Sequence, residues 1–198
     1  MITAGRRSSV VNFIKRAGTA ALVSVLLSFS AAASVSVGFR AVIGTDTSGC
    51  SMIVPDGTLD FSAVRARDLT GPVTTYQIQP LQIALLCQDT SEAVIPSLTL
   101  TGTTPYTGTA GTVFLDGTAN GAGFMVRLSS GSTPSLTDFY NTAEAVANNG
   151  APAEMTTLDS SNDYYSEETL LVGLVGPLGD SVVPGPFSAT LVVNVVFQ

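Results

Sequence analysis

Short runs of alternating apolar and polar residues recur along the chain from residue 34 onward. Clusters of glycine, threonine, serine and proline separate these runs. An alternation with a period of two places the apolar side chains on one face of a β-strand, and many short strands divided by turn residues are typical of a β-sandwich. The sequence therefore predicts an all-β fold of eight or nine strands. The candidate strands are SVSVGFRAVI, GTLDFSAV, YQIQPLQIALLC (broken at Pro80), IPSLTLTG, GTVFLDG, GFMVRLSS, ETLLVGLVG and FSATLVVNVVFQ.

Only residues 138–149, DFYNTAEAVANN, have local helical character. Asp138 is placed to cap a short helix that carries Ala143, Val146 and Ala147, and Gly150 would end it. We expect this helix to lie within a long loop that continues to residue 168.

Residues 1–33 are typical of a secretory signal peptide. Arg6, Arg7, Lys15 and Arg16 precede the apolar run AGTAALVSVLLSFSAAA, which ends in small residues. We expect cleavage before Ser34 and export of the mature chain. A membrane anchor is the alternative, but residues 17–33 are few and interrupted by hydroxyl residues.

The predicted mature chain is strongly acidic. It retains four basic and fifteen acidic residues, a net charge of −11, and it has no lysine. Such a surface repels nucleic acid and anionic lipid, so both are excluded as partners. Its length suits a single domain.

Cys50 and Cys87 are the only two cysteines. In an exported protein, the simple expectation is one disulfide between them. Two free thiols or half of a metal site are the alternatives, and the absence of histidine makes a metal site a poor fit.

The sequence offers little for catalysis, and we predict no enzyme, no cofactor and no metal site. The chain has no histidine, and the mature part has no lysine to serve as a base. Four carboxylates cluster near two tyrosines in a loop at residues 159–168, the acidic loop: Asp159, Asp163, Glu167 and Glu168. A solvated loop explains this cluster. A carboxylate-based glycosidase and an oxygen-rich calcium site are the alternatives.

The two ends of the mature chain are both strongly strand-like. In the last run, Leu191, Val193, Val195 and Phe197 share one face. If this strand lies at a sheet edge, its open backbone groups beside apolar side chains create an aggregation hazard. Insertion of the first strand of one copy into the sheet of the next, by β-augmentation, would cover that edge.

Over its whole length the mature chain resembles subunits of chaperone–usher fimbriae, the surface pili of Gram-negative bacteria, and most of all their minor, adaptor-type pilins. LLVGLVGPLGDSVVPGPFSA is similar to the penultimate strand and following turn of that family, and LQIALLC to the strand with the second cysteine. The C-terminal motif that carries the resemblance consists of Gly185, Leu191, Val193, Val195, Phe197 and Gln198.

The resemblance implies an immunoglobulin-like β-sandwich that lacks its last strand and is completed by donor-strand exchange. It implies a pilin domain at residues 49–198 and an N-terminal extension with a polar spacer at residues 34–48. A periplasmic chaperone would fill the groove and grip the carboxylate of Gln198. At the outer-membrane usher, the next subunit's extension would replace the chaperone, and the fibre would reach the cell surface.

The donor strand implied by the resemblance comprises Val35, Val37, Phe39, Ala41 and Ile43. The family often has a small residue at one inserting position, but Gly38 falls on the opposite face and only Ala41 is small on the inserting face. The alternative is that residues 34–43 are an ordinary first strand paired within their own chain.

The predicted function is a structural or adaptor subunit of a fimbria that supports bacterial adhesion. The alternative function is a single-domain tip subunit that itself binds a host receptor through the acidic loop.

Overall fold

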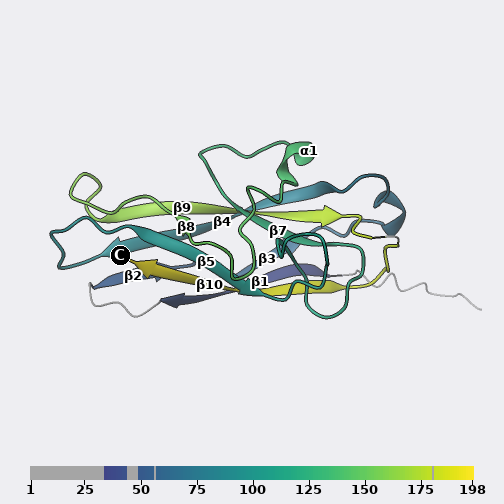
Figure 1. Ribbon diagram of the computed structural model, residues 1–198, viewed down its shortest axis with the longest axis horizontal. Coiled ribbons are helices and arrows are strands. Elements are labelled where there is room, and N and C mark those ends of the chain that lie inside the picture. The colour runs from purple at the N-terminus through teal and green to yellow at the C-terminus, as the bar shows by residue number, and fades with distance from the viewer. Residues whose placement is uncertain (1–33, 44–48, 56, 180) are drawn as a thin grey trace, which may run out of the picture. The chain divides into compact units, whose positions relative to one another are not determined.

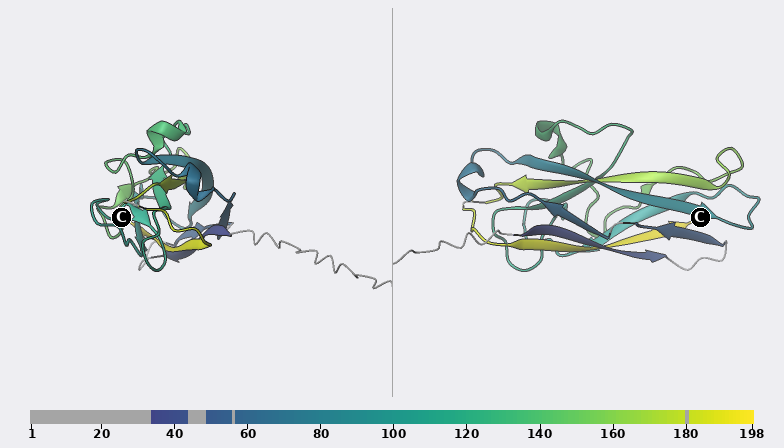
Figure 2. Two further views of the ribbon diagram at one scale, coloured as in Figure 1. Left: turned by 90° about the vertical axis from the view of Figure 1, so that its right-hand side faces the viewer. Right: turned by 180° about the vertical axis from the view of Figure 1, so that it is seen from behind.

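The computed structural model describes residues 34–43, 49–55, 57–179 and 181–198 as a β-sandwich. Two five-stranded sheets lie face to face, and the short helix α1 (Leu136–Phe139) lies outside one of them (Figures 1 and 2). The all-β prediction is confirmed. The predicted signal peptide at residues 1–33 lies outside the described residues.

The first sheet contains, in order, β3 (Thr58–Phe61), β1 (Val35–Ile43), β10 (Phe187–Phe197), β5 (Pro96–Gly102) and β8 (Ala153–Glu154). The second contains, in order, β2 (Cys50–Ile53), β4 (Thr74–Cys87), β9 (Tyr165–Gly176), β7 (Gly123–Leu128) and β6 (Val113–Phe114). A single 3₁₀ turn, η1 (Ala66–Asp68), follows β3.

The main core lies between the two sheets, where the alternating runs point one set of side chains inward. Val37 of β1 and Val193 of β10 meet Ile83 of β4 and Val172 of β9 there, and all four are 0% exposed. At one end of the sandwich the ring of Phe124 lies 5.2 Å from that of Phe61 and 5.5 Å from that of Phe187. The alternation seen in the sequence therefore corresponds to burial.

The sequence analysis expected Pro80 to break its strand, and this prediction was wrong. β4 continues through it from Thr74 to Cys87. The apparent change of pattern arises because Ile78 faces the outer side of the second sheet, whereas Leu81, Ile83 and Leu85 face the main core. Proline is tolerated there because β2 pairs with β4 only from Ala84 to Cys87, so one edge of β4 has no paired strand at Pro80.

The prediction that Asp138 caps a helix over residues 138–149 was wrong. The helix is α1, and Ser135 caps it, because its side chain accepts a hydrogen bond from the Asp138 backbone N–H. The Ser135 hydroxyl also donates to the Asp138 carboxylate at 2.6 Å, which holds Asp138 inside the first turn. After Tyr140 the chain continues in turns, stabilised by the Asn141 side chain, which accepts from the Ala143 N–H.

Candidate functional site

The groove between β10 and β3 is the candidate functional site, and β1 of the same chain fills it. β1 pairs in parallel with β10, from Val35 beside Phe187 to Ile43 beside Val195. Its other edge pairs antiparallel with β3. β10 is therefore flanked on both sides, by β1 and by β5.

The inward side chains of β1 form part of the main core. Val35, Val37 and Phe39 are 4%, 0% and 7% exposed, respectively. The Phe39 N–H donates to the Gly57 carbonyl at 2.6 Å, which extends the pairing beyond β3. Beyond Val35 the groove continues into a cavity of about 210 Å³.

The sequence analysis left open whether residues 34–43 pair with their own domain or enter a neighbour. In the single chain they pair with their own domain. Gly38 lies on the outer face, where a Cβ atom would have no neighbour within 4 Å. Ala41, the small residue of the predicted inserting face, pairs with Val193.

The predicted C-terminal motif lies along β10. Leu191, Val193 and Val195 are 0% exposed, and Phe197 is half-buried against the same core. Gln198 continues the pairing by exchanging backbone hydrogen bonds with Ile95 at 2.8 and 3.2 Å.

Gly185 precedes β10 with a φ angle of +155°, a conformation that L side chains rarely adopt. A glycine at this position lets the chain turn into β10 without steric cost.

Asp116 is a functional candidate that the sequence analysis missed. β5 pairs with β10 only from Leu191 onward, so the beginning of β10 has no strand on that side. Asp116 takes the place of a strand there: its carboxylate accepts from the Thr190 N–H at 3.1 Å, and its own N–H donates to the Ser188 carbonyl at 2.8 Å. Its only signal in the sequence is the Asp–Gly turn that follows GTVFL.

Cys50 and Cys87 form the predicted disulfide. They are directly paired residues of β2 and β4, and both are buried. The bond joins the beginning of β2 to the end of β4.

We expect the double variant Cys50→Ser, Cys87→Ser to lose about 3–4 kcal/mol of unfolding free energy, because the unfolded chain regains the loop entropy. Urea unfolding of the purified mature protein, followed by circular dichroism, measures the loss. A midpoint equal to that of the parent protein would contradict it.

The predicted acidic loop ends earlier than residue 168, because β9 begins at Tyr165, and its residues form local hydrogen bonds. The Asp159 carboxylate accepts from the Ser161 hydroxyl and N–H at 2.6 and 2.8 Å, and these bonds lower its pKa. The Tyr165 hydroxyl donates to Glu167 at 2.6 Å, which raises the pKa of the tyrosine. Glu168 is buried and accepts from the Thr156 N–H at 2.9 Å.

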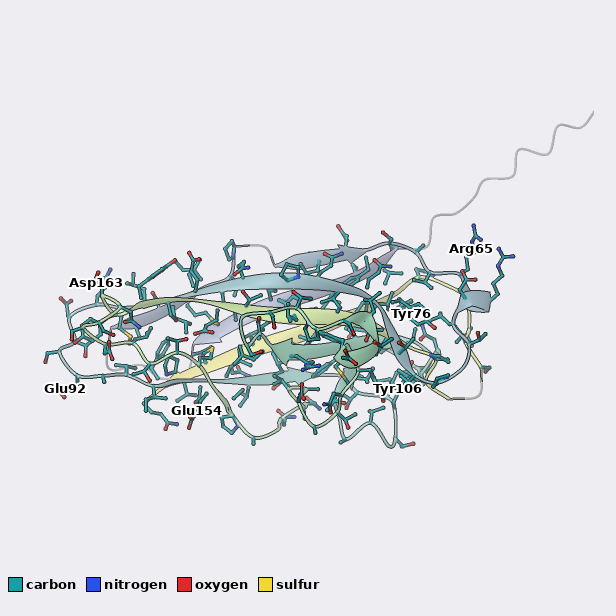
Figure 3. All side chains as sticks on the ribbon, turned by 90° about the horizontal axis from the view of Figure 1, so that it is seen from above. Arg65, Tyr76, Glu92, Tyr106, Glu154 and Asp163 are labelled. Carbon is teal, nitrogen blue, oxygen red and sulfur yellow. A yellow bond between two sulfur atoms is a disulfide. The ribbon has the colours of Figure 1, made fainter. Side chains whose placement is uncertain are left out.

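Figure 3 shows the opposite ends of the sandwich. Asp163 and Glu92 lie at one end and Arg65 at the other, with Tyr106 in the half nearer Arg65. Nowhere in the described residues do three histidine, cysteine, aspartate or glutamate side chains come together as a metal site. No helix in the same residues combines the length and hydrophobicity of a membrane span.

Among solved structures, the chain is similar to PapA, the rod subunit of the P pilus, with 20% identity and a TM-score of 0.54 over 76% of this chain and 99% of that chain. It is also similar to a chain of a chaperone–usher pilus whose structure addresses rod uncoiling, with 19% identity and a TM-score of 0.54 over 78% of this chain and 91% of that one. These two likenesses concern the fold.

A weaker likeness, with a TM-score of 0.46 and 20% identity, is to the CupB6 tip adhesin from Pseudomonas aeruginosa, over 76% of this chain and 44% of that one. It supports no conclusion about this chain. No curated protein sequence matches the chain. The model of the fimbrial protein family matches residues 27–198, which include β1, both cysteines and β10. The chain therefore belongs to the fimbrial protein family.

Proposed function

We propose that this protein is a structural or adaptor subunit of a chaperone–usher fimbria and that it polymerises by donor-strand exchange. The observation that carries the proposal is the position of β1. This strand is the N-terminal element of the described chain, yet it lies between β10 and β3 and supplies core side chains to the first sheet. An identical strand from another copy could make the same contacts, which is the general basis of segment swapping between protomers.

The direction of β1 follows from its short connection to β2. Residues 44–49 join Ile43 to Cys50, and the seven steps between these two residues span at most about 25 Å. Ile43 pairs with Val195 and Cys50 pairs with Cys87, near the end of the sandwich where Gln198 meets Ile95. If β1 ran antiparallel to β10, its last residue would lie at the far end, about 30 Å away for a nine-residue strand.

A strand donated by a second copy is free of this constraint. It can enter the groove in either direction, because alternation places the same set of side chains inward both ways. Each inward Val, Ile or Phe side chain contributes about 1.5–3 kcal/mol of burial, so a donor strand supplies on the order of 10 kcal/mol before ordering costs. That energy is available to any strand that displaces β1.

The proposed partners are a periplasmic chaperone, an outer-membrane usher and neighbouring subunits, and the proposed location is a surface fimbrium reached through the periplasm. In a chaperone complex, the chaperone strand would occupy the position of β1. Gln198 is exposed at the end of β10, where a partner can reach it, and its backbone oxygen accepts from the Ile95 N–H at 2.8 Å.

We propose no catalytic role. Glu168 of the acidic loop is bound to the Thr156 backbone and Glu167 to Tyr165, so neither is poised as a free acid beside an empty cleft. Host-receptor binding by a tip subunit remains the alternative function, and the experiment below separates it from the adaptor role.

Deletion of residues 34–42 tests the proposal. An internal adaptor that lacks its donor strand can still accept a neighbour's strand but cannot insert into the preceding subunit. We therefore expect fibres to lack every subunit beyond the deletion point, as measured by immunoelectron microscopy of cells that express the variant. A matched control replaces Gly38 with serine on the outer face of β1 and should leave fibres intact. Normal fibres with the deletion, as expected for a subunit at the tip, would contradict the adaptor role.

A further inference from the structure

An open cavity of about 570 Å³ lies outside the second sheet, away from the groove filled by β1. Its walls come from residues 105–109, from the segment around Gly121, from Tyr140 after α1 and from the segment that follows β9. The volume falls within the range of small-molecule sites, about 300–1,000 Å³. Figure 3 shows Tyr106 of this cavity in the half of the sandwich away from Asp163, and no residue of the acidic loop lines the cavity.

Tyr106 forms a rigid wall of the cavity. Its hydroxyl donates to the Ala122 carbonyl at 2.6 Å and accepts from the N–H groups of Asn120 and Gly121 at 3.2 and 3.1 Å. These bonds saturate the hydroxyl and hold the ring in place. The ring, rather than the hydroxyl, is therefore the part of Tyr106 that a ligand could contact.

Tyr140 is positioned by the residue before it. Phe139 is 0% exposed and packs onto Gly173, where even a Cβ atom would come within 2.3 Å of the ring. Arg127 lies over the Phe139 ring, 5.4 Å from its centre, and donates to the carbonyls of Asp138 and Phe139 at 3.0 Å. Arg127 is itself paired with Glu144. The end of α1 is thereby fixed, and Tyr140 with it.

The hydroxyl of Tyr140 has no hydrogen-bond partner among the described residues. Burial raises its pKa, so it remains a neutral phenol at physiological pH and can both donate and accept a hydrogen bond. The exposed hydroxyl residues Thr107 and Ser181 also line the cavity. At Gly108 and Gly179 the backbone itself forms the wall, because nothing lies within 4 Å of a Cβ built there.

The charges of the chain restrict the ligand. None of the four arginines of the mature chain lines the cavity, and the mature chain has no lysine. No cationic side chain at this site therefore offsets the negative charge of the protein, which disfavours anionic ligands. Aromatic rings, hydroxyls and bare backbone together match a molecule with one apolar C–H face and a rim of hydroxyl groups.

We propose that the cavity between Tyr106 and Tyr140 binds an uncharged saccharide of one or two pyranose rings. The C–H face of a sugar packs on a tyrosine ring, and its hydroxyls bond to Tyr140, Thr107 and the exposed backbone. This binding does not depend on strand exchange, so the two proposals can fail separately.

The test is a titration of the ¹⁵N-labelled mature protein with four probes: methyl α-mannoside, methyl β-galactoside, N-acetylglucosamine and anionic N-acetylneuraminic acid. We expect at least one neutral probe to produce saturable shifts of the Gly108 and Gly179 amide signals, and the anionic probe to produce none. No saturable shift with any neutral probe, shifts confined to other regions, or stronger binding of the anionic probe would overturn the proposal.

Variants locate the site. Tyr140→Ala should weaken binding at least about tenfold, because it removes both a ring and a hydroxyl, and Tyr140→Phe or Thr107→Val should weaken it about two- to tenfold by the loss of one hydrogen bond. The last two changes preserve side-chain shape and report on the site even if Tyr140→Ala does not fold. Tyr165→Ala, in the distant acidic loop, is the matched control and should bind as the parent does. Equal binding by Tyr140→Phe and Thr107→Val would place the sugar elsewhere and overturn the assignment.

Discussion

The isolated mature protein carrying Val37→Asp is expected to be unfolded. Val37 is 0% exposed at the centre of β1, and no cation faces it in the core cluster around it. A buried carboxylate without a partner costs several kcal/mol, whereas a whole domain is stable by about 5–15 kcal/mol. Thermal denaturation followed by circular dichroism should show no cooperative transition.

Ser36→Asn is the control, since Ser36 neighbours Val37 on the opposite face of the same strand, and a neutral side chain avoids repulsion with Asp60, which pairs with Ser36. It should retain a cooperative transition near that of the parent. A synthetic peptide of residues 34–43 should restore folding of the Val37→Asp chain by entering the groove in place of the damaged strand. A stable Val37→Asp protein would show that β1 is dispensable for the core. Failure of the peptide would mean that the strand acts only within its own chain, which contradicts donor exchange.

Val195→Asp is expected to abolish recovery of the subunit in complex with its chaperone from the periplasm. Val195 of β10 is 0% exposed and pairs with Ile43 of β1. A chaperone strand in the place of β1 would pair with the same residue. A charge there disrupts the core and the surface on which the incoming strand packs. Co-purification with an affinity-tagged chaperone measures the effect.

The adjacent variant Val196→Asp provides the control. Val196 is 43% exposed on the outer face of the same strand. The same substitution one residue later should therefore leave recovery close to the parent level. If both variants were recovered normally, the C-terminal strand would not be the chaperone-binding element. If both were lost, the effect would not depend on the inward face.

Much of the fold could be predicted because burial follows alternation. Leu191, Val193 and Val195 were assigned to one face of the last strand from their spacing, and they are fully buried. The disulfide followed from the cysteine count and the predicted export. β2 and β8, with four and two residues, were not among the predicted strands.

Other features depended on contacts that spacing cannot encode. Spacing places Ile78 and Leu81 of β4 on opposite faces, but it does not show that the outer face of the second sheet is also partly buried, under the loops around α1. Ser135 rather than Asp138 caps α1, since either side chain could serve locally. Asp116 reaches β10 from more than seventy positions away along the chain, so no local pattern predicts its role.

The sequence alone determined most of the strands, the buried side of the last strand, and that the two cysteines join, because these properties depend on side-chain periodicity and composition. Only the tertiary structure decided that β1 lies between β10 and β3, that it runs parallel to β10, and that Tyr106 and Tyr140 share a cavity. Alternation specifies a face for a strand but not a neighbour or a direction. In the single chain, the six residues between Ile43 and Cys50 set that direction.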